Sequence, residues 1–442
     1  MSLDISPENC SYRGEGNVGL VISLKKEEKV LKLIKQENGS VVVNHEESFF
    51  KELENQVKIV ENVMKPLLGN AFVNTPVIVH LQKDEIKMIN GMVDKFRPGS
   101  RQHKSVKEED CHVFMLPDYC SLPPHMKMFP SFGPVISIEI KPKQGFVLSD
   151  NDSSLSPNSY STCRFCLMQG YKMRRGVISS RSAYCPTDLF SGCSLRMLHA
   201  LKMLLKSPQN NFRMFKDQKL VYSEEKKEDL NKLLSDFFDS EKKSSYSDML
   251  CNLVIKALLE PFEEGSYKFL VHLLNKISQR CANSNPCEEN EFCHKLPRGC
   301  VLERILNVQS LDTMELTKLY PLYRKIIVNS EQSSDYVGCI SRYSIPSHVG
   351  ENLKQSNESD YHFASRKVWE FLVALTMKDC SIMLAFKKVL NCGLKLRNQN
   401  VISDDYGNSY LMSIAIADLD IKHISKVEKL YKERPFLLES CA

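Results

Sequence analysis

"VISIEIKPKQGF", residues 135–146, joins an apolar strand to a cluster of charged side chains. With the two-residue period of a β-strand, Ile136, Ile138 and Ile140 lie on one face. The other face carries polar and charged side chains: Ser137, Glu139, Lys141 and Lys143. The isoleucines predict a buried face of a sheet. The charges opposite them are open to two interpretations, a strand end that faces water or a site for an anionic ligand.

The rest of the chain predicts an α+β fold. Helical periodicity marks residues 194–207 and 366–377, whereas residues 381–386 and 409–421 have the pattern of strands. Strand patterns are concentrated towards the N-terminus. A chain of 442 residues is long enough for two lobes, or for two to three domains, with a substantial core.

The composition is that of a soluble globular protein, with 42% hydrophobic and 26% charged residues. A net charge of +5 is too small for a general nucleic-acid binder, so any cationic site must be local. The first residues lack the order of a secretory signal, and no apolar run approaches the ~20 residues that span a bilayer. The sixteen cysteines are then expected to be reduced thiols or metal ligands. We therefore expect a cytoplasmic or nuclear protein that binds neither nucleic acid nor membrane.

A glycine-rich segment, "YRGEGNVGLVISL" (residues 12–24), leads into a strand pattern. Its glycines have a G-x-G-x-x-G spacing: Gly14, Gly16 and Gly19. A dinucleotide-binding fold would open a helix here, but β-branched residues follow, and then a second strand, residues 30–35. A glycine turn between strands, with a lysine on the next strand, is how kinases cover nucleotide phosphates. Lys32 and Lys35 are the candidate cations, and a plain hairpin with edge lysines is the alternative.

Carboxylates occur at the ends of two late strand patterns. In "SIAIADLDIK", residues 413–422, Asp418 and Asp420 share one parity and leave the strand together. Carboxylates of this kind hold Mg²⁺ together with substrate phosphates, although a strand end whose acids face water fits the pattern too. Asp379 lies between a helix end and a strand, where it is either a base aimed into a cleft or a turn residue.

Six blocks of sequence, taken together, resemble the inositol-pentakisphosphate 2-kinase family. They occur in the family's order and span almost the whole chain: "GEGN" (14–17), "EIKPKQG" (139–145), "YCPTDLFSG" (184–192), "PQNNFRMF" (208–215), "KDCSIM" (378–383) and "DLDIK" (418–422). The glycine block alone is weakly specific, whereas the combination of the other blocks is specific.

The resemblance implies a two-lobed kinase, with an N-terminal lobe over residues 1–120 and a C-terminal lobe over residues 121–442. The implied reaction uses ATP and Mg²⁺ to phosphorylate the 2-hydroxyl of inositol 1,3,4,5,6-pentakisphosphate, which gives the hexakisphosphate, phytate. We expect a monomer. Five phosphates at about −1.5 to −2 each give the substrate a charge of roughly −7 to −10. Unpaired lysines at a strand end are useful beside such a ligand.

The resemblance also implies roles for individual residues. Contacts to the inositide phosphates are implied for Arg101, Lys141, Lys143, Lys172, Asn210, Asn211, Arg213, Lys422, Lys426 and Tyr431. Contacts to ATP are implied for Gly14, Gly16, Asn17, Lys32, Asp118 and Glu139. Asp118 ends the "MLPD" segment, which resembles the hinge between the lobes, whose backbone binds adenine. Asp379 resembles the residue that accepts the proton of the attacking hydroxyl, and Asp418 resembles the Mg²⁺ ligand.

The C-terminal segment departs from the family pattern. After "DLDIK" the family continues with proline and a tyrosine-bearing segment, whereas this chain has "HISKVEKLYKERP", residues 423–435. This departure leaves two alternatives to the kinase: a catalytically weak protein that binds inositol polyphosphates, and a kinase of another inositol phosphate or lipid headgroup.

Three cysteines have the spacing of an incomplete zinc site. Cys163 and Cys166 form a C-x-x-C pair, and Cys185 follows about 20 residues later. The fourth ligand is open between Cys193 and a histidine distant in sequence. The alternative is a set of reduced cysteines on a loop.

Overall fold

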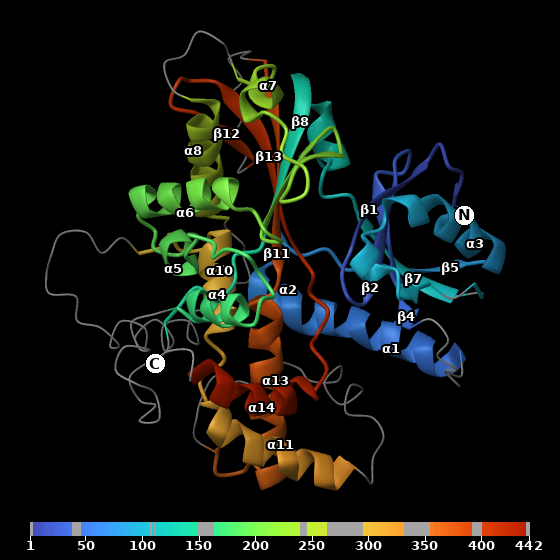
Figure 1. Cartoon of the computed structure of the whole chain (residues 1–442), viewed down its shortest axis with the longest axis vertical. Helices are drawn as coiled ribbons and strands as arrows, with labels where there is room; N and C mark the ends of the chain where they lie inside the picture. Colours follow the sequence, from blue (N-terminus) through green and yellow to red (C-terminus); the bar gives the residue numbers. More distant parts are fainter. Residues whose placement is uncertain are drawn as a thin grey trace, which may run out of the picture.

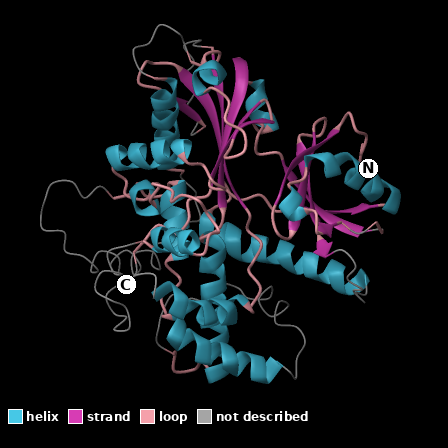
Figure 2. Ribbon diagram, viewed as in Figure 1, coloured by secondary structure: helices cyan, strands magenta, loops and turns pink. Residues whose placement is uncertain are grey.

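The computed structural model describes residues 3–37, 46–106, 108–109, 111–147, 163–238, 245–262, 295–330, 354–390 and 400–438. Two antiparallel sheets lie side by side, and most of the helices gather around the larger one (Figures 1 and 2). The predicted α+β fold is confirmed. None of the described helices is long and apolar enough to cross a membrane.

The N-terminal sheet has the order β1-β2-β3-β7-β5. Its strands are β1 (Cys10–Glu15), β2 (Gly19–Leu24), β3 (Lys29–Ile34), β7 (Cys111–Pro117) and β5 (Val77–Leu81). Alternate residues of β2 and β3, such as Leu20, Ile22 and Leu31, form its own small core. That core is covered by α3 (Lys83–Val93), whose Ile86 and Ile89 belong to the same cluster. A separate two-stranded ribbon joins β4 (Gln36–Glu37) and β6 (Lys104–Ser105).

The large sheet has the order β10-β9-β8-β11-β13-β12. Its strands are β10 (Lys219–Tyr222), β9 (Phe212–Lys216), β8 (Ser131–Ile140), β11 (Ser381–Val389), β13 (Ser409–Ala417) and β12 (Val401–Ser403). Ile136, Ile138 and Ile140 on β8 are completely buried in the main core, as their alternation predicts. The strand predicted over residues 409–421 is too long. It ends at Ala417 because Asp418 has a φ of +61°, which breaks the extended backbone.

The main core lies between the large sheet and a group of helices. These are α4 (Arg164–Arg174), α5 (Pro186–Leu189), α6 (Ser194–Lys206), α7 (Leu230–Leu234), α8 (Tyr246–Leu259), α10 (Val301–Gln309), α11 (Leu316–Ser330), α13 (Asp360–Met377) and α14 (Lys426–Leu438). Helix α6 matches the predicted helix 194–207, and α13 begins six residues before the predicted helix 366–377. Helix α13 is buried almost throughout, with Trp369 fully enclosed.

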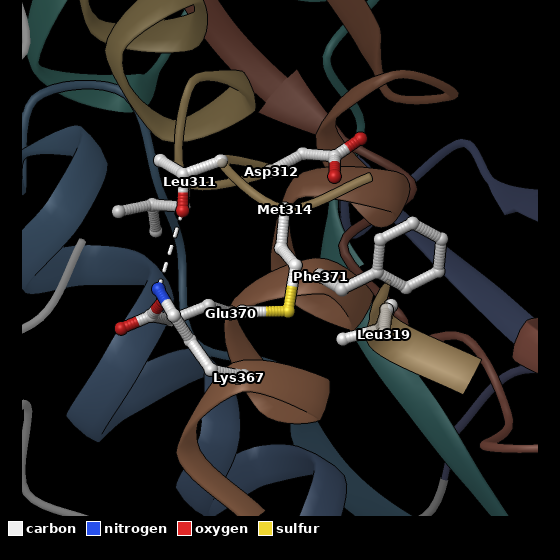
Figure 3. Close-up of a pocket in the computed structure, with 8 residues that line it drawn as sticks. Leu311, Asp312, Met314, Leu319, Lys367, Glu370 and Phe371 are labelled. Carbon is white, nitrogen blue, oxygen red and sulfur yellow. Dashed lines mark hydrogen bonds and ion pairs between the residues drawn. The ribbon is translucent and has the colours of Figure 1, made fainter. Parts of the chain in front are cut away.

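Charged side chains on α13 are buried only in pairs. Lys367 contacts Glu370 at 2.6 Å and donates to the hydroxyl of Thr313 at 3.2 Å (Figure 3). Arg366 contacts Glu358 at 2.8 Å and Glu370 at 3.3 Å. An isolated buried charge is costly, and these ion pairs give each of the three buried charges on α13, Arg366, Lys367 and Glu370, a partner of opposite sign.

One helical segment joins the two sheets. Helix α1 (Glu46–Ile59) packs against β5 and β7 of the N-terminal sheet and continues through a π-helical turn, Val60–Met64, into α2 (Lys65–Leu68). Helix α2 packs against α10, and the segment from Ile59 to Val73 belongs to the main core. A division of the chain at residue 120 separates the two sheets but cuts this segment from the core in which it is buried.

Candidate active site

Three central strands of the large sheet reach one edge together. Strand β11 pairs antiparallel with β8 on one side and with β13 on the other, so Ile140 lies opposite Ile382, and Ser381 lies opposite Ala417. The end of β8, the start of β11 and the end of β13 therefore meet at this edge. Lys141, Asp379 and Asp418, which come from three distant parts of the sequence, are adjacent for this reason.

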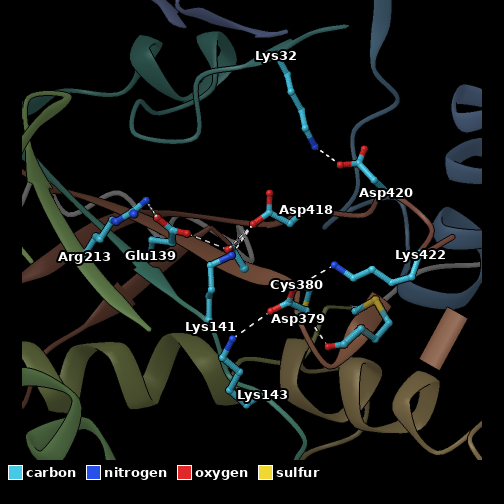
Figure 4. Close-up of polar contacts among 12 residues, drawn as sticks. Lys32, Glu139, Lys141, Lys143, Arg213, Asp379, Cys380, Asp418, Asp420 and Lys422 are labelled. Carbon is cyan, nitrogen blue, oxygen red and sulfur yellow. Dashed lines mark hydrogen bonds and ion pairs between the residues drawn. The ribbon is translucent and has the colours of Figure 1, made fainter. Parts of the chain in front are cut away.

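Acidic and basic side chains alternate across this edge, which we call the ion-pair cluster (Figure 4). Its contacts are Lys141 with Asp418 at 2.8 Å, Lys143 with Asp379 at 3.1 Å, Lys422 with Asp379 at 3.0 Å, Arg213 with Glu139 at 3.4 Å, and Lys32 with Asp420. The first four contacts join residues of the large sheet and its loops. The last brings a lysine of the N-terminal sheet across to the same place.

The lysine turn, residues 141–145, is held by its backbone. The N–H of Lys141 donates to the carbonyl oxygen of Asn211 at 2.9 Å, and the hydroxyl of buried Tyr184 donates to the carbonyl oxygen of Pro142 at 2.8 Å. At Gly145, a Cβ atom would lie 2.5 Å from the ring of Phe190, so only glycine fits. The backbone of the turn is therefore fixed, and the side chains of Lys141 and Lys143 are the parts that can move to meet a ligand.

Two residues of the cluster have unfavourable backbone conformations. Lys143 and Asp418 both have a φ of +61°, a region that residues other than glycine rarely adopt. Such strain persists where the surrounding structure fixes it, and it is typical of functional sites. At Asp418 the conformation turns the chain at the end of β13, and its carboxylate contacts Lys141.

The charges around the two aspartates keep both ionised. Partial burial alone would raise the pKa of Asp379, but Lys143 and Lys422 outweigh it and lower the pKa to about 2. At Asp418 burial acts in the same direction, and Lys141 and Lys32 hold the pKa well below its usual range. Both carboxylates are therefore available as proton acceptors or metal ligands at neutral pH.

The lysines of the cluster respond in different directions. Burial lowers the pKa of Lys143 and outweighs the opposing effect of Asp379. Burial also acts on Lys141, but Asp418 and Glu139 overcome it and raise its pKa. The pKa values of the two lysines in this turn are thus shifted in opposite directions, and the site stabilises the charged form of Lys143 less than that of Lys141.

Ser381 links two carboxylates of the cluster. Its hydroxyl lies 2.9 Å from Glu139 and 3.0 Å from Asp418, and its single hydrogen can serve one of them at a time. Its position at the start of β11 places it between Glu139 on β8 and Asp418, which directly follows β13. The sequence pattern did not identify Ser381, although it belongs to the "KDCSIM" block.

The structure separates the two candidate lysines, Lys32 on β3 and Lys35 directly after it. Lys32 points to Asp420, whereas Lys35 is buried in an ion pair with Glu15, which Arg97 also contacts at 2.9 Å. Only Lys32 faces the ion-pair cluster. Gly19 lies directly beside it, since a Cβ atom there would be 3.3 Å from the Lys32 side chain.

The glycine hairpin lies near the cluster and is tied to Arg101. The N–H of Gly16 donates to the carbonyl oxygen of Gly19 at 2.8 Å, which closes the turn, and Arg101 contacts the side chain of Asn17. Gly14 faces Arg213, whose guanidinium would lie 3.5 Å from a Cβ atom there. The guanidinium of Arg101 thus binds the hairpin, and its predicted contact with the inositide stays a prediction.

Asp118 has a structural role. Its carboxylate is buried and accepts hydrogen bonds from Ser23 at 3.0 Å and from the N–H of Cys120 at 3.0 Å, and it forms an ion pair with Arg13. Arg13 also donates to the carbonyl oxygen of Gln218 in the β9–β10 turn. These contacts occupy both carboxylate oxygens. The resemblance assigns the adenine to the backbone of the hinge, so the ATP contact at Asp118 stays a prediction. The side chain itself joins β1 to the linker between the sheets.

The remaining predicted phosphate ligands are placed differently from one another. Lys172 on α4 lies near enough to Lys143 to add to the lowering of its pKa. Asn210 is exposed, whereas Asn211 is buried, and within the described part of the chain its side-chain amide has no hydrogen-bond partner. Tyr431 on α14 stacks on Tyr320 of α11, with ring centroids 4.0 Å apart, and so packs between helices rather than in the cluster.

The three predicted metal-binding cysteines converge at the start of α4 and α5. The sulfur of Cys163 lies 3.1 Å from that of Cys166 and 3.6 Å from that of Cys185. All three ligand atoms lie within 4.8 Å of one another. Three sulfurs bound to one tetrahedral zinc at 2.3 Å would be about 3.8 Å apart, so the cluster could hold such an ion.

Comparison with known proteins points to one family. A family model described as inositol-pentakisphosphate 2-kinase matches residues 12–434. A zebrafish (Danio rerio) inositol-pentakisphosphate 2-kinase is 30% identical over 98% of this chain and 93% of its own length. The protein of that name from Arabidopsis thaliana is 26% identical over 95% and 90%, and one from Drosophila melanogaster is 28% identical over 48% of each chain.

Proposed function

The chain belongs to the inositol-pentakisphosphate 2-kinase family, and we propose that it transfers the γ-phosphate of ATP to inositol 1,3,4,5,6-pentakisphosphate. Inositol has six hydroxyls, so this substrate leaves only the 2-hydroxyl free to accept a phosphate. The product is the hexakisphosphate, phytate. We propose that the chain acts as a monomer in the cytoplasm or nucleus.

The ion-pair cluster is the observation that supports this proposal most. It gathers five cations and four carboxylates at one edge: Lys32, Lys141, Lys143, Arg213 and Lys422, with Glu139, Asp379, Asp418 and Asp420. A substrate with a charge of roughly −7 to −10 competes for those cations. One lysine about 4 Å from a phosphate charge gains roughly 4 kcal/mol at an effective dielectric constant of 20, which is enough to compete with a half-exposed ion pair.

Asp379 is the proposed base. Two lysines hold its pKa to about 2 in the free protein, which makes it a weak base. When substrate phosphates draw Lys143 and Lys422 away, the carboxylate loses its stabilising charges and gains negative neighbours, and its pKa rises. Substrate binding would thus strengthen the base at the moment at which a hydroxyl lies beside it.

The nucleotide is proposed to lie between the glycine hairpin and the large sheet. Backbone N–H groups of the hairpin would contact phosphate oxygens, and Lys32 would add a cation. The paired oxygens of Asp418 and Glu139, joined by Ser381, fit the oxygen ligands that Mg²⁺ prefers. When bound, Mg²⁺ would neutralise phosphate charge during the transfer.

A panel of substrates tests the proposal. With ATP and Mg²⁺, we expect turnover of the pentakisphosphate to exceed that of inositol phosphates that have several free hydroxyls, and no turnover of a phosphoinositide in vesicles. Tight pentakisphosphate binding without turnover would favour a binding protein. Faster turnover of another inositol phosphate, or of the lipid, would favour a kinase with a different substrate.

Replacement of Lys141 and Lys143 by Met should weaken pentakisphosphate binding far more than ATP binding. Two contacts of about 1.5–3 kcal/mol each correspond to a loss of at least roughly 100-fold, because 1.4 kcal/mol is a factor of about ten. Calorimetry at several salt concentrations measures this, and the difference between variant and parent should shrink as salt screens the contacts.

The matched control is Lys216→Met with Lys256→Met. Those lysines pair with Asp236 and Asp405, away from the cluster, and their removal changes the net charge equally. Equal losses of pentakisphosphate and ATP affinity in the Lys141/Lys143 variant would mean that these lysines support the cleft rather than bind substrate.

We also propose that Cys163, Cys166 and Cys185 hold a structural Zn²⁺ with a fourth ligand, either Cys193 or a histidine. The convergence of their sulfurs supports this, and a bound ion would fix the start of α4, which carries Lys172. The three cysteines lie outside the ion-pair cluster, so a zinc ion bound to them would stabilise the fold and would not take part in the reaction.

Replacement of Cys163 and Cys166 by Ser should abolish zinc binding and lower the melting temperature, because structural zinc contributes folding energy directly. Metal analysis should find about one zinc per chain in the parent protein and none in the variant. A second variant, Cys193→Ser at a half-buried cysteine, removes zinc only if Cys193 is the fourth ligand. A metal-free parent protein of undiminished stability would contradict the assignment.

A further inference from the structure

Gln309, the last residue of α10, is completely buried and binds only backbone groups. Its Nε2 donates to the carbonyl oxygen of Lys143 at 2.8 Å and to that of Met377 at 3.0 Å. Its Oε1 accepts the N–H of Gly145 at 2.9 Å. One side chain therefore connects the lysine turn with the C-terminal end of α13.

Both connected segments lead directly into the ion-pair cluster. Lys143 contacts Asp379 at 3.1 Å, and Met377 precedes Asp379 by two residues. The carbonyl group of Met377 is one of those that a helix leaves without an intrahelical partner at its C-terminus, and it also accepts the thiol of Cys380 at 3.2 Å. Gln309 thus fixes the backbone on both sides of the contact between Lys143 and Asp379.

The end of α10 is itself firmly attached to α13. Asp312, three residues after Gln309, pairs with Lys378, and Thr313 accepts a hydrogen bond from Lys367 (Figure 3). These contacts hold Gln309 in place against α13, and its hydrogen bonds in turn hold the lysine turn. The turn needs such support, because Lys143 has the unfavourable φ of +61°.

We propose that Gln309 is a positioning residue for phosphoryl transfer, whose amide sets the spacing of the backbone segments that carry Lys143 and Asp379. Lys143 would hold a substrate phosphate while Asp379 receives the hydroxyl proton, so this spacing places the acceptor against its base. The inference rests on the proposed kinase function. A displacement of about 1 Å at such a contact can lower a rate on the order of 10²-fold.

Gln309→Met keeps the approximate shape and removes all three hydrogen bonds. We expect kcat to fall on the order of 10²-fold and pentakisphosphate affinity to fall about tenfold, with ATP affinity changed less than about twofold. Gln309→Glu, neutral in its buried site, keeps the acceptor and one donor and should lose less. The control is Leu302→Ala, which leaves a cavity in the core seven residues earlier on the same helix.

A double-mutant cycle separates positioning from general stability. If Gln309 acts through Lys143, Gln309→Met should cost less than about twofold in pentakisphosphate affinity when Lys143 is already Met. Gln309→Met with parental kcat and affinity, or with an undiminished affinity loss in the Lys143→Met background, would overturn the proposal. The proposal would also be overturned if Leu302→Ala and Gln309→Met had the same melting temperature and the same loss of kcat. An inactive parent chain would refute the kinase, and the affinity cycle would still decide the role of Gln309.

Discussion

Asp379→Asn should lower kcat by about 10²- to 10⁴-fold, the range of general-base contributions. The amide keeps the shape of the carboxylate but accepts no proton from the 2-hydroxyl. Pentakisphosphate affinity should stay unchanged or improve, because one negative charge beside a polyanion is gone and Lys143 and Lys422 lose the carboxylate that competes for them. Steady-state kinetics and calorimetry measure the two effects.

The matched control for this variant is Asp405→Asn. Asp405 is an exposed aspartate that pairs with Lys256 at 2.8 Å, away from the ion-pair cluster, so kcat should stay at the parental value. A large loss of pentakisphosphate affinity in Asp379→Asn, with kcat nearly unchanged, would show that Asp379 organises the binding site and is not the base.

Asp418→Asn should weaken Mg²⁺-ATP binding as well as turnover. Contacts to charged groups contribute about 1.5–3 kcal/mol, so we expect a loss of roughly 10- to 100-fold in apparent affinity. Excess Mg²⁺ should restore part of the activity by mass action, and nucleotide binding titrated at several Mg²⁺ concentrations measures this.

The response to Mg²⁺ distinguishes the two aspartates. Excess metal should not restore Asp379→Asn, because a proton acceptor cannot be replaced by more metal. Rescue at Asp379 and none at Asp418 would mean that the two roles are reversed.

The sequence predicted those features that depend on local periodicity. The isoleucines of β8 are buried as their alternation requires, and α6 and α13 lie where helical spacing placed them. Shared parity does not account for the place of Asp418 and Asp420 in the cluster, because both lie beyond the end of the strand. It could not reveal that the strand ends at Ala417, because a positive φ at Asp418 leaves no trace in a polar and apolar pattern.

Features that depend on distant partners were not predictable from the pattern. The sequence offers both Lys32 and Lys35 as candidate cations, and only their partners in the fold, Asp420 and buried Glu15, distinguish them. Gln309 binds carbonyl groups of residues 166 and 68 positions away, and backbone groups have no sequence signature. Asp118 matches the family hinge by position, but the sequence pattern does not predict that its side chain is buried against Arg13 and Ser23.

The identity of the reaction product tests the central claim most directly. The purified chain is incubated with ATP, Mg²⁺ and inositol 1,3,4,5,6-pentakisphosphate, and the products are separated by chromatography and examined by phosphorus NMR. The account predicts the hexakisphosphate, with the new phosphate on the 2-position and one ADP formed for each product molecule. ATP consumption without that product, or no consumption at all with the substrate bound, would contradict it.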